Sequence, residues 1–479
     1  MLFDPCTIDS SIWRLMAEAL LSKCLNAVWK RSVSPDQIWS GTKFTDLPCI
    51  PIREMTPDII GASTGPQEGL CEILLDSASP LTTPDMCTLI AGVSNWKCPL
   101  SEADGLSFSL YDHKVGMTDE RNGDPNADVY AVIARPNNAI LAIADGCSWG
   151  PKPRQAARCA VRGSMEYLNQ QFFDTVDKPH NTQDIVRNML LSFHSAQKMI
   201  VENNGTTTTL CVAVVCELAE SKGENGWGLC VVSVGDSPCF VWQKKTGQVF
   251  EVTSASHSGH VRDMRDSGGC LGTSMGQQPD LDNLVCCYMT VAEGDAVFLT
   301  SDGISDNFDP VTRLEGATDG ARNAKKPERT QVAAAPQNDQ YPASKRPILT
   351  PRQRQTMLLS NISQLLNNAR LQILQQELSA WELNNAVIKY VIELTDTKRR
   401  YMEHAMKDIG NPTHSKAEKE AKELDFKVKL KSFKGKLDHA TIVTYKICLL
   451  DDARHALSGT SYVNIEQSEK GTTKSPGSF

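Results

Sequence analysis

Short apolar runs recur through the middle and the end of the chain. They are rich in Val, Ile and other residues that favour strands, and most are bounded by Gly, Asp or Asn. This length and these boundaries are typical of strands in a packed sheet. The pattern predicts strands at 129–134, 139–144, 210–218, 229–234, 239–242, 284–290, 296–300 and 441–449.

Two segments with helical periodicity interrupt the strands, at 154–172 and 185–202. Several of the other strands follow one another with no helix between them. Parallel neighbours need a crossover connection, so this order favours antiparallel sheets. We therefore predict an α+β domain over residues 106–450.

The flanking regions have a different character. Residues 10–29 predict an amphipathic helix, and the Pro-, Thr-, Ser- and Gly-rich stretch after it predicts an irregular N-terminal extension that reaches residue 105. Residues 310–350 are polar and predict a disordered insertion within the domain. Residues 351–405 predict a helical insertion, and residues 451–479 a flexible tail.

The helical insertion carries one apolar stripe between residues 353 and 395. Such a stripe usually packs on its own domain, and the alternative is a surface for a protein partner. The stripe consists of Leu358, Leu359, Ile362, Leu365 and Leu366. The Lys-rich stretch 416–436 predicts a solvated surface, with a phosphoprotein or membrane-surface role as the alternative.

Composition narrows the class of protein. The 479 residues are 41% hydrophobic and carry a formal net charge of −8, so nothing global indicates nucleic acid or membrane as a partner. The first residues lack a basic segment followed by an apolar one, and no run approaches the ~18 apolar residues of a membrane span. We expect an intracellular protein, cytoplasmic or nuclear or both.

The 16 cysteines do not predict a disulfide framework or a zinc site, because no C-x-x-C pair is present. Several of them lie inside the predicted strands, where a thiol acts as a small hydrophobic group. These are Cys211, Cys216, Cys230, Cys286 and Cys287.

Candidate chemistry lies at strand ends. Asp145 and Asp302 each follow an apolar run and precede a glycine, and Asp438 stands just before the last strand. Carboxylates that a rigid fold brings together repel one another unless a cation neutralises them. Oxygen ligands favour Mg²⁺ or Mn²⁺ over Zn²⁺. An isolated Asp-Gly is above all a turn dipeptide, so the order of the surrounding motifs matters.

That order resembles the PPM-type, or protein phosphatase 2C-like, family of serine/threonine phosphatases. Six segments follow one another as the family's motifs do: Asp145-Gly146-Cys147-Ser148-Trp149-Gly150, Gly205-Thr206-Thr207-Thr208-Thr209, Val234-Gly235-Asp236-Ser237, Gly269-Cys270-Leu271-Gly272, Thr300-Ser301-Asp302-Gly303-Ile304-Ser305-Asp306 and Asp438-His439-Ala440-Thr441. The resemblance spans about residues 106–450, without the region 310–430.

The resemblance implies a sandwich of two antiparallel sheets flanked by helices, with two metal ions at one end. In the family a water between the metals attacks phosphoserine or phosphothreonine directly. Carried over, Asp145 would bridge both ions, the Gly146 carbonyl would hold the second, and Asp302 and Asp438 would hold the first. Asp236 matches a third, weaker metal position, and Asp128 lies in the counterpart of the family's opening motif.

Several positions depart from the family's pattern. Ala127 replaces the acid or amide of the opening motif, and Gly123 stands at the spacing of its phosphate-binding arginine, with Arg121 as the nearest substitute. Cys147 stands where many members have a histidine that protonates the leaving group, and a thiol is a weaker proton donor. His439 and Pro238 replace an asparagine and an arginine.

Two functions follow as hypotheses. The first is a metal-dependent phosphatase that hydrolyses phosphoserine or phosphothreonine in protein substrates with Mg²⁺ or Mn²⁺. The second is a pseudophosphatase that keeps the fold and acts as a regulatory or scaffolding module. The retained aspartates favour the enzyme, and the altered substrate-handling positions favour the module.

Overall fold

The structure, a computed structural model, describes most of the predicted domain and part of the chain before it. The described residues are 38–41, 47–71, 89–116, 120–219, 226–257, 267–316, 347–373 and 377–450. The predicted helix 10–29, the tail 451–479 and residues 317–346 of the insertion lie outside them. Within the described residues no helix is both long and apolar enough to cross a membrane.

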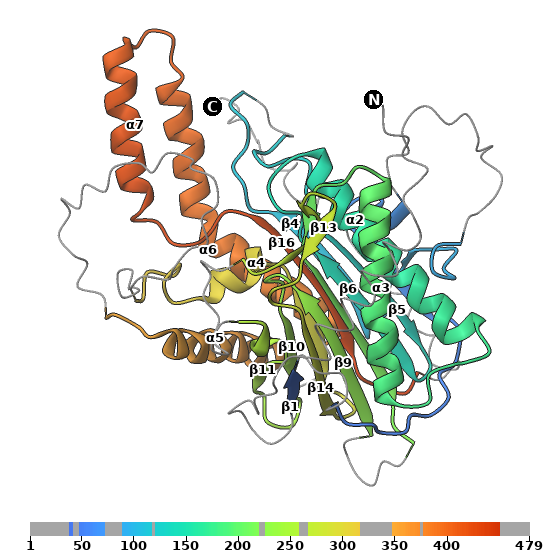
Figure 1. Cartoon of the computed structure of the whole chain (residues 1–479). Helices are drawn as coiled ribbons and strands as arrows, with labels where there is room; N and C mark the ends of the chain where they lie inside the picture. The colour runs from blue at the N-terminus through green and yellow to red at the C-terminus, as the bar shows by residue number, and fades with distance from the viewer. Residues whose placement is uncertain are drawn as a thin grey trace, which may run out of the picture.

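Two antiparallel sheets form the centre of the domain (Figure 1). The larger has eight strands in the order β1 (Ile38–Gly41), β14 (Val285–Val291), β9 (Trp227–Val234), β8 (Leu210–Glu217), β6 (Asn138–Ala144), β5 (Val129–Arg135), β2 (Gly61–Gly65) and β3 (Lys97–Cys98). The second has the order β11 (Val249–Glu251), β10 (Cys239–Trp242), β15 (Ala296–Thr300), β16 (His439–Lys446) and β4 (Ala103–Ser109). The predicted α+β class is confirmed.

Strands β6 and β8 are apolar apart from Asn138 at the start of β6 and Glu217 at the end of β8, and both faces of each strand are buried. In β6, Ile140 and Ala142 face the helices, whereas Leu141 and Ile143 face the second sheet. Successive side chains of a strand point to opposite faces, so one uninterrupted apolar run supplies two cores.

Helices cover both outer faces of the sandwich (Figure 1). Helices α2 (Pro151–Asn169) and α3 (Thr182–Glu202) pack on the larger sheet, as their predicted positions indicated. Helices α5 (Pro351–Gln372) and α6 (Ala380–Ile409) pack on the second sheet. The predicted stripe of α5 faces its own domain, because Leu358, Ile362 and Leu366 are buried in this core.

The region predicted as one helical segment consists of separate helices. Helix α5 ends at Gln372, α6 begins at Ala380, and α7 (Lys416–Leu430) follows. The end of α6 and the whole of α7 protrude from the domain as an antiparallel pair (Figure 1). Helix α7 contains no buried residue, as a solvated Lys-rich stretch predicts.

Part of the predicted N-terminal extension belongs to the larger sheet. Strand β2 pairs with β5, and β1 pairs with β14 at the far edge. Two residues of this region, Leu70 and Trp96, are buried in the core beneath α2 and α3. The irregular composition of residues 33–102 concealed these strands because they are short and rich in Gly and Ser.

Candidate active site

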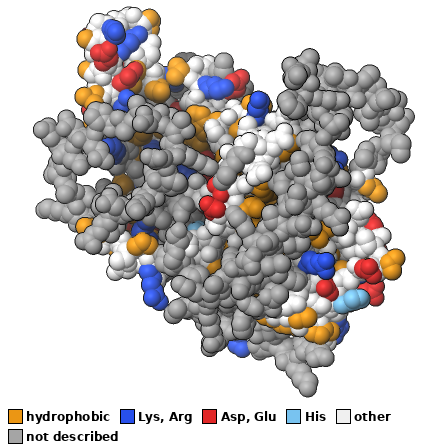
Figure 2. Space-filling model, viewed as in Figure 1, with side chains coloured by type: hydrophobic (Ala, Val, Ile, Leu, Met, Phe, Trp, Pro, Cys, Tyr) orange, Lys and Arg blue, Asp and Glu red, His pale blue; other side chains and the backbone are white. Residues whose placement is uncertain are grey.

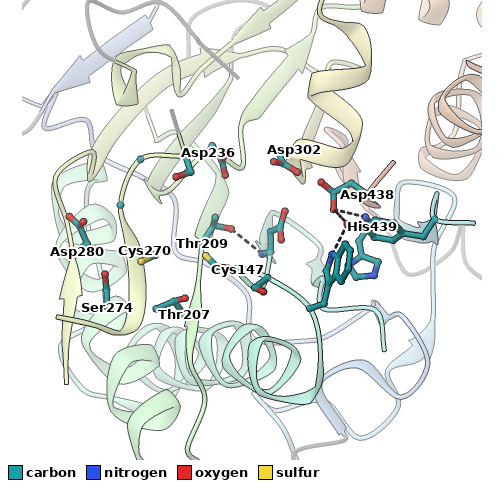
Figure 3. Close-up of a pocket in the computed structure, with 18 residues that line it drawn as sticks. Cys147, Thr207, Thr209, Asp236, Cys270, Ser274, Asp280, Asp302, Asp438 and His439 are labelled. Atoms are coloured by element: carbon teal, nitrogen blue, oxygen red, sulfur yellow. Dashed lines mark hydrogen bonds between the residues drawn. The ribbon is translucent and has the colours of Figure 1, made fainter. Parts of the chain in front are cut away.

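A pocket of about 440 Å³ opens at one end of the sandwich. Asp145, Asp236, Asp302 and Asp438 line it together with the Gly146 backbone. The structure thus brings the three strand-end aspartates into one place, with Asp236 beside them. Figure 3 shows Asp236, Asp302 and Asp438 along one side of the pocket, and Cys147, Cys270 and Ser274 on the other.

Backbone contacts between neighbouring strands fix Asp145. Its amide donates to the Thr209 hydroxyl at 2.9 Å, and its carbonyl accepts from the Thr209 amide at 2.9 Å and the Thr208 hydroxyl at 2.8 Å. Thr209 in turn contacts the hydroxyl of Ser237, beside Asp236. Thr208 and Thr209 therefore fix the position of Asp145, and Thr209 also connects it to the segment that carries Asp236.

The glycines after two of the aspartates are required for space. A Cβ on Gly146 would lie 2.5 Å from the Pro153 carbonyl oxygen, and one on Gly303 would lie 1.9 Å from the carbonyl oxygen of His439. Neither glycine has a positive φ. The Asp-Gly pairs thus allow the backbones of separate segments to approach closely, which brings the adjacent carboxylates together.

Crowding shifts the acid–base properties of these aspartates. Burial raises the pKa of Asp145 well above its usual value, and the nearby carboxylates of Asp128, Asp302, Asp438 and Asp236 raise it further. Burial and the Asp306 carboxylate likewise raise the pKa of Asp302. The site therefore carries an excess of negative charge that favours a bound cation or a proton.

Asp128 lies behind the pocket and is 1% exposed. Neither of its carboxylate oxygens has a hydrogen-bond partner at normal geometry among the described residues, although the Ser301 and Thr441 hydroxyls are near. Burial raises its pKa, and nearby His439 opposes that rise. A buried carboxylate without such partners is costly, and an additional cation or water would reduce the cost.

Asp438 is held by several neutral groups. Its Oδ1 accepts from the Tyr111 hydroxyl and from the His439 amide, each at 2.9 Å. Trp149 donates its indole N–H to the Tyr111 oxygen at 2.9 Å. Tyr111 also packs edge-on against His439. Tyr111 has no motif signal in the sequence, and it enters the site because β4, which precedes it, pairs with β16.

Lys436 is the residue that the sequence interpretation misjudged. Its Nζ forms ion pairs with Asp302, Asp306 and Asp438, and the side chain is only 30% exposed. The stretch 416–436 was predicted to be solvated throughout, and that prediction is wrong at this residue. The sequence did contain one signal for this role, because Lys436 lies only two residues before the predicted site residue Asp438.

Arg121 is not among the residues that line the pocket. Its Nη1 donates to the carbonyl oxygen of Tyr111 at 2.9 Å, and its guanidinium lies over the ring of Phe108 at 5.2 Å from the centroid. The Cys147 thiol does line the pocket. A hydrogen bond with Cys270, then burial, raises the pKa of Cys147, so this thiol is a poor proton donor.

The oxygen atoms that line the pocket are of the kind that a hard divalent cation prefers. Those of Asp302 and Asp438 already contact a lysine, so they are less available to such a cation. Within the described ranges, no three His, Cys, Asp or Glu side chains come close enough to hold one metal ion. Mg²⁺ is usually held by one or two carboxylates and several waters, so it does not need such a cage. Asp145, Asp236 and Gly146 line the pocket and contribute oxygen donors, whereas Asp302 and Asp438 contact the ammonium of Lys436.

Comparisons with known proteins agree with the resemblance. Residues 115–334 match the family model described as Protein phosphatase 2C. A Drosophila melanogaster protein named PP2C-like domain-containing protein CG9801 is 41% identical over 242 residues, which are 50% of this chain and 34% of that protein. The chain therefore spans about a third of the length of this relative.

Solved structures of low identity also match. The photosystem II phosphatase PBCP is 16% identical with a TM-score of 0.31, and the match covers 73% of this chain and 92% of PBCP. The catalytic domain of the serine/threonine phosphatase PstP, in complex with two manganese ions, is 12% identical with a TM-score of 0.31, over 72% of this chain and 97% of that one.

Proposed function

We propose that this chain, which carries a protein phosphatase 2C-like domain, is a metal-dependent hydrolase of phosphoserine or phosphothreonine in proteins, and that its turnover is slow. The observation that supports this proposal is the gathering of Asp145, Asp236 and Asp302 in one pocket at the end of the sandwich. A fold does not by itself imply a function, so the argument rests on these side chains.

In this proposal Asp145, Asp236 and the Gly146 carbonyl hold Mg²⁺ or Mn²⁺. A bound divalent cation of this kind polarises phosphoryl oxygens and lowers the pKa of a water nucleophile. Without a cation the pocket repels a phosphate, because the aspartates that line it outnumber the positive charge that Lys436 supplies to Asp302 and Asp438. Phosphate binding should therefore require prior loading of the cation.

The remaining groups explain why we expect slow turnover. Arg121 donates to a backbone carbonyl, so the pocket lacks its predicted phosphate-binding guanidinium. The neutral thiol of Cys147 provides little general-acid assistance, a form of catalysis typically worth ~10²–10⁴-fold. The Nδ1 atom of His439 accepts a hydrogen bond from the Ala127 amide at 3.3 Å, so this nitrogen is engaged with the backbone.

A phosphothreonine peptide and Mn²⁺ test the proposal. Wild-type protein should release phosphate only with Mn²⁺, and Asp145→Asn should abolish release while the fold, measured by circular dichroism, persists. Asp58→Asn is the matched control, because Asp58 is exposed and distant in sequence from every site motif. Absence of Mn²⁺-dependent release from wild-type protein would refute the hydrolase.

The pseudophosphatase is a second candidate, and the Lys436 ion pairs favour it. An ammonium beside Asp302 and Asp438 reduces the attraction of that side for divalent cations. A protein that keeps its fold but gives no phosphate release at any Mn²⁺ concentration, and that binds a protein partner through its helical insertion, would support this candidate.

A further inference from the structure

The Lys436 side chain reaches the acidic pocket from the loop before β16. Its Nζ lies 3.0 Å from Asp306 Oδ2 and 2.9 Å from Asp438 Oδ2, and it also contacts Asp302 Oδ2. One ammonium thus contacts three carboxylates that come from two separate segments of the chain. The ammonium thus supplies these carboxylates with positive charge that a divalent ion would otherwise supply.

The fold holds the lysine backbone in place. The Asn307 side chain accepts from the Lys436 amide at 2.8 Å and donates to the Lys436 carbonyl at 3.0 Å. Asn307 is fully buried, and it also donates to the Gly303 carbonyl at 2.7 Å, one residue after Asp302. Lys398 donates to the carbonyl of Gly435. Lys436 is therefore fixed at the site and is unlike the solvated lysines of α7.

The acids that Lys436 contacts are largely or fully buried. Asp306 is 1% exposed, and the Oδ1 atom of Asp302 is buried without a hydrogen-bond partner among the described residues. Both oxygens of Asp438 are engaged, Oδ2 by Lys436 and Oδ1 by Tyr111 and the His439 amide. Burial alone would lower the pKa of Lys436, but the carboxylates of Asp306, Asp302 and Asp438 outweigh it and raise the pKa.

We propose that Lys436 is a built-in cation that takes the place of one divalent metal ion between Asp302 and Asp438. The pocket then has room for a divalent cation only on the side of Asp145 and Asp236. Within the proposed hydrolase, Lys436 thus limits the number of divalent ions that the pocket binds. This role concerns cation binding rather than the rate of turnover.

The physical reason is competition for the same oxygens. A divalent ion between Asp302 and Asp438 would meet the positive charge of Lys436, which is tethered to the chain and therefore present at a high effective concentration. Removal of the ammonium takes one positive charge away from Asp302, Asp306 and Asp438 and so increases the repulsion between them. A divalent ion that enters their centre relieves this repulsion.

The test is the number of Mn²⁺ ions bound per chain, measured by isothermal titration calorimetry and by loss of the free Mn²⁺ signal in electron paramagnetic resonance. Lys436→Ser and Lys436→Gln remove the charge, and each should bind one more Mn²⁺ than the wild-type protein. Lys436→Arg keeps the charge and should bind the wild-type number. Lys434→Ser is the matched control, because Lys434 is exposed and only two residues away.

A second readout is the effect of Mn²⁺ on thermal stability. The gain in Tm on addition of Mn²⁺ should be larger for Lys436→Ser than for the wild-type protein, since an ion that binds only the folded state adds RT ln(1 + [L]/Kd). Equal stoichiometry in the wild-type protein and both neutral variants would overturn the proposal. Two Mn²⁺ ions on the wild-type protein would also overturn it, even if neither neutral variant folds.

These outcomes are distinguishable from failure of the proposed hydrolase. A wild-type protein without phosphate release, together with one additional Mn²⁺ on Lys436→Ser, would refute the hydrolase and support the role of Lys436. Phosphate release by the wild-type protein, together with the wild-type number of bound Mn²⁺ ions in both neutral variants, would support the hydrolase and refute the role of Lys436.

Discussion

The guanidinium of Arg354 and the carboxylate of Asp309 form a buried, forked ion pair. The Nη2–Oδ2 distance is 2.7 Å and the Nε–Oδ2 distance is 3.1 Å, and the two side chains are 1% and 4% exposed. Asp309 ends the 3-10 turn Asp306–Phe308 that follows the short helix α4 (Asp302–Ser305), and Arg354 lies in the first turn of α5. The pair therefore connects the helical insertion to the segment that positions the site.

Arg354→Met should destabilise the protein by about 3–5 kcal/mol, because it leaves the Asp309 charge buried without its partner. Urea unfolding followed by circular dichroism measures the change. Arg352→Met in the same helix is the control, since Arg352 is exposed. A loss below about 1 kcal/mol for Arg354→Met would show that Asp309 finds compensation elsewhere.

Asp145→Asn should stabilise the cation-free protein and abolish its stabilisation by Mn²⁺. The neutral amide removes the repulsion from Asp128, Asp302, Asp438 and Asp236 that accompanies the Asp145 charge. We expect a rise in Tm of roughly 1–2 °C without metal, the shift that about 1 kcal/mol gives in a domain of more than about 300 residues. Differential scanning calorimetry with EDTA and with Mn²⁺ compares the two states.

The Asp145→Asn prediction has a specific failure. If the variant melts at a lower temperature than the wild-type protein in EDTA, then the charge of Asp145 is compensated in the cation-free fold. Asp58→Asn should leave both measurements unchanged.

The pH dependence of stability should change in Asp104→Asn. Burial raises the pKa of Asp104 to about 6 from an ordinary value of 3.8, so the folded state binds the proton more tightly than the unfolded chain. The stability that this group contributes is full below about pH 4 and is lost as pH rises through about 6. At pH 7.5 the variant should exceed the wild-type protein by at most about 3 kcal/mol.

This advantage of Asp104→Asn should shrink as pH falls from 7 to 4, because the wild-type carboxyl then becomes protonated. Urea unfolding at several pH values gives the difference. Asp177→Asn, at an exposed position, serves as the control. A constant difference between pH 4 and 7.5 would be inconsistent with a raised pKa at Asp104.

Helix α7 should be separable from the stability of the domain. Tyr401 of α6 stacks on Phe426 of α7 at a centroid distance of 5.8 Å and on Phe433 at 4.7 Å. Figure 2 shows basic, acidic and apolar side chains interspersed on this protruding pair, at upper left. Phe426→Ala removes one aromatic contact and should loosen α7 alone.

Hydrogen exchange measures the effect of Phe426→Ala. Exchange should accelerate in residues 416–430 and remain unchanged in β6 and β8, with less than about 0.5 kcal/mol lost from the domain, as for a substitution outside the core. Leu424→Ala is the control, because Leu424 is 67% exposed on the same helix. Slower exchange, or a cooperative loss of the whole domain, would contradict this independence.

Sequence reasoning predicted the elements whose signal is local. The strands around residues 140 and 212 were recoverable because both of their faces are buried, which makes them continuous apolar runs. Asp145, Asp236, Asp302 and Asp438 were recoverable because each stands close to a strand end, whereas Asp280, which also lines the pocket, was not predicted. Capping boxes at Thr350–Gln353, Ser379–Glu382 and Ser415–Glu418 mark the starts of α5, α6 and α7. The second box would have divided the predicted helical segment 351–405, and the third would have identified a helix in the Lys-rich stretch after it.

The missed features depend on contacts between distant parts of the chain. Strand β2 is identifiable only through its pairing with β5, since its sequence contains Gly, Ser and Thr. Lys436 belongs by composition to a solvated stretch, and only the fold brings it to three aspartates. Tyr111 reaches Asp438 across 327 residues. No periodicity in a single sequence encodes such distances.

The position of β16 has a consequence for synthesis of the protein. This strand lies between β15 and β4 in the second sheet, although helices α4 to α7 separate β15 from β16 along the described part of the chain. Until the ribosome has produced residues 439–446, β15 and β4 each present an unpaired edge, and such edges recruit other strands. A nonsense mutation anywhere in α5, α6 or α7 would therefore yield a product prone to aggregation, and would also remove Lys436 and Asp438.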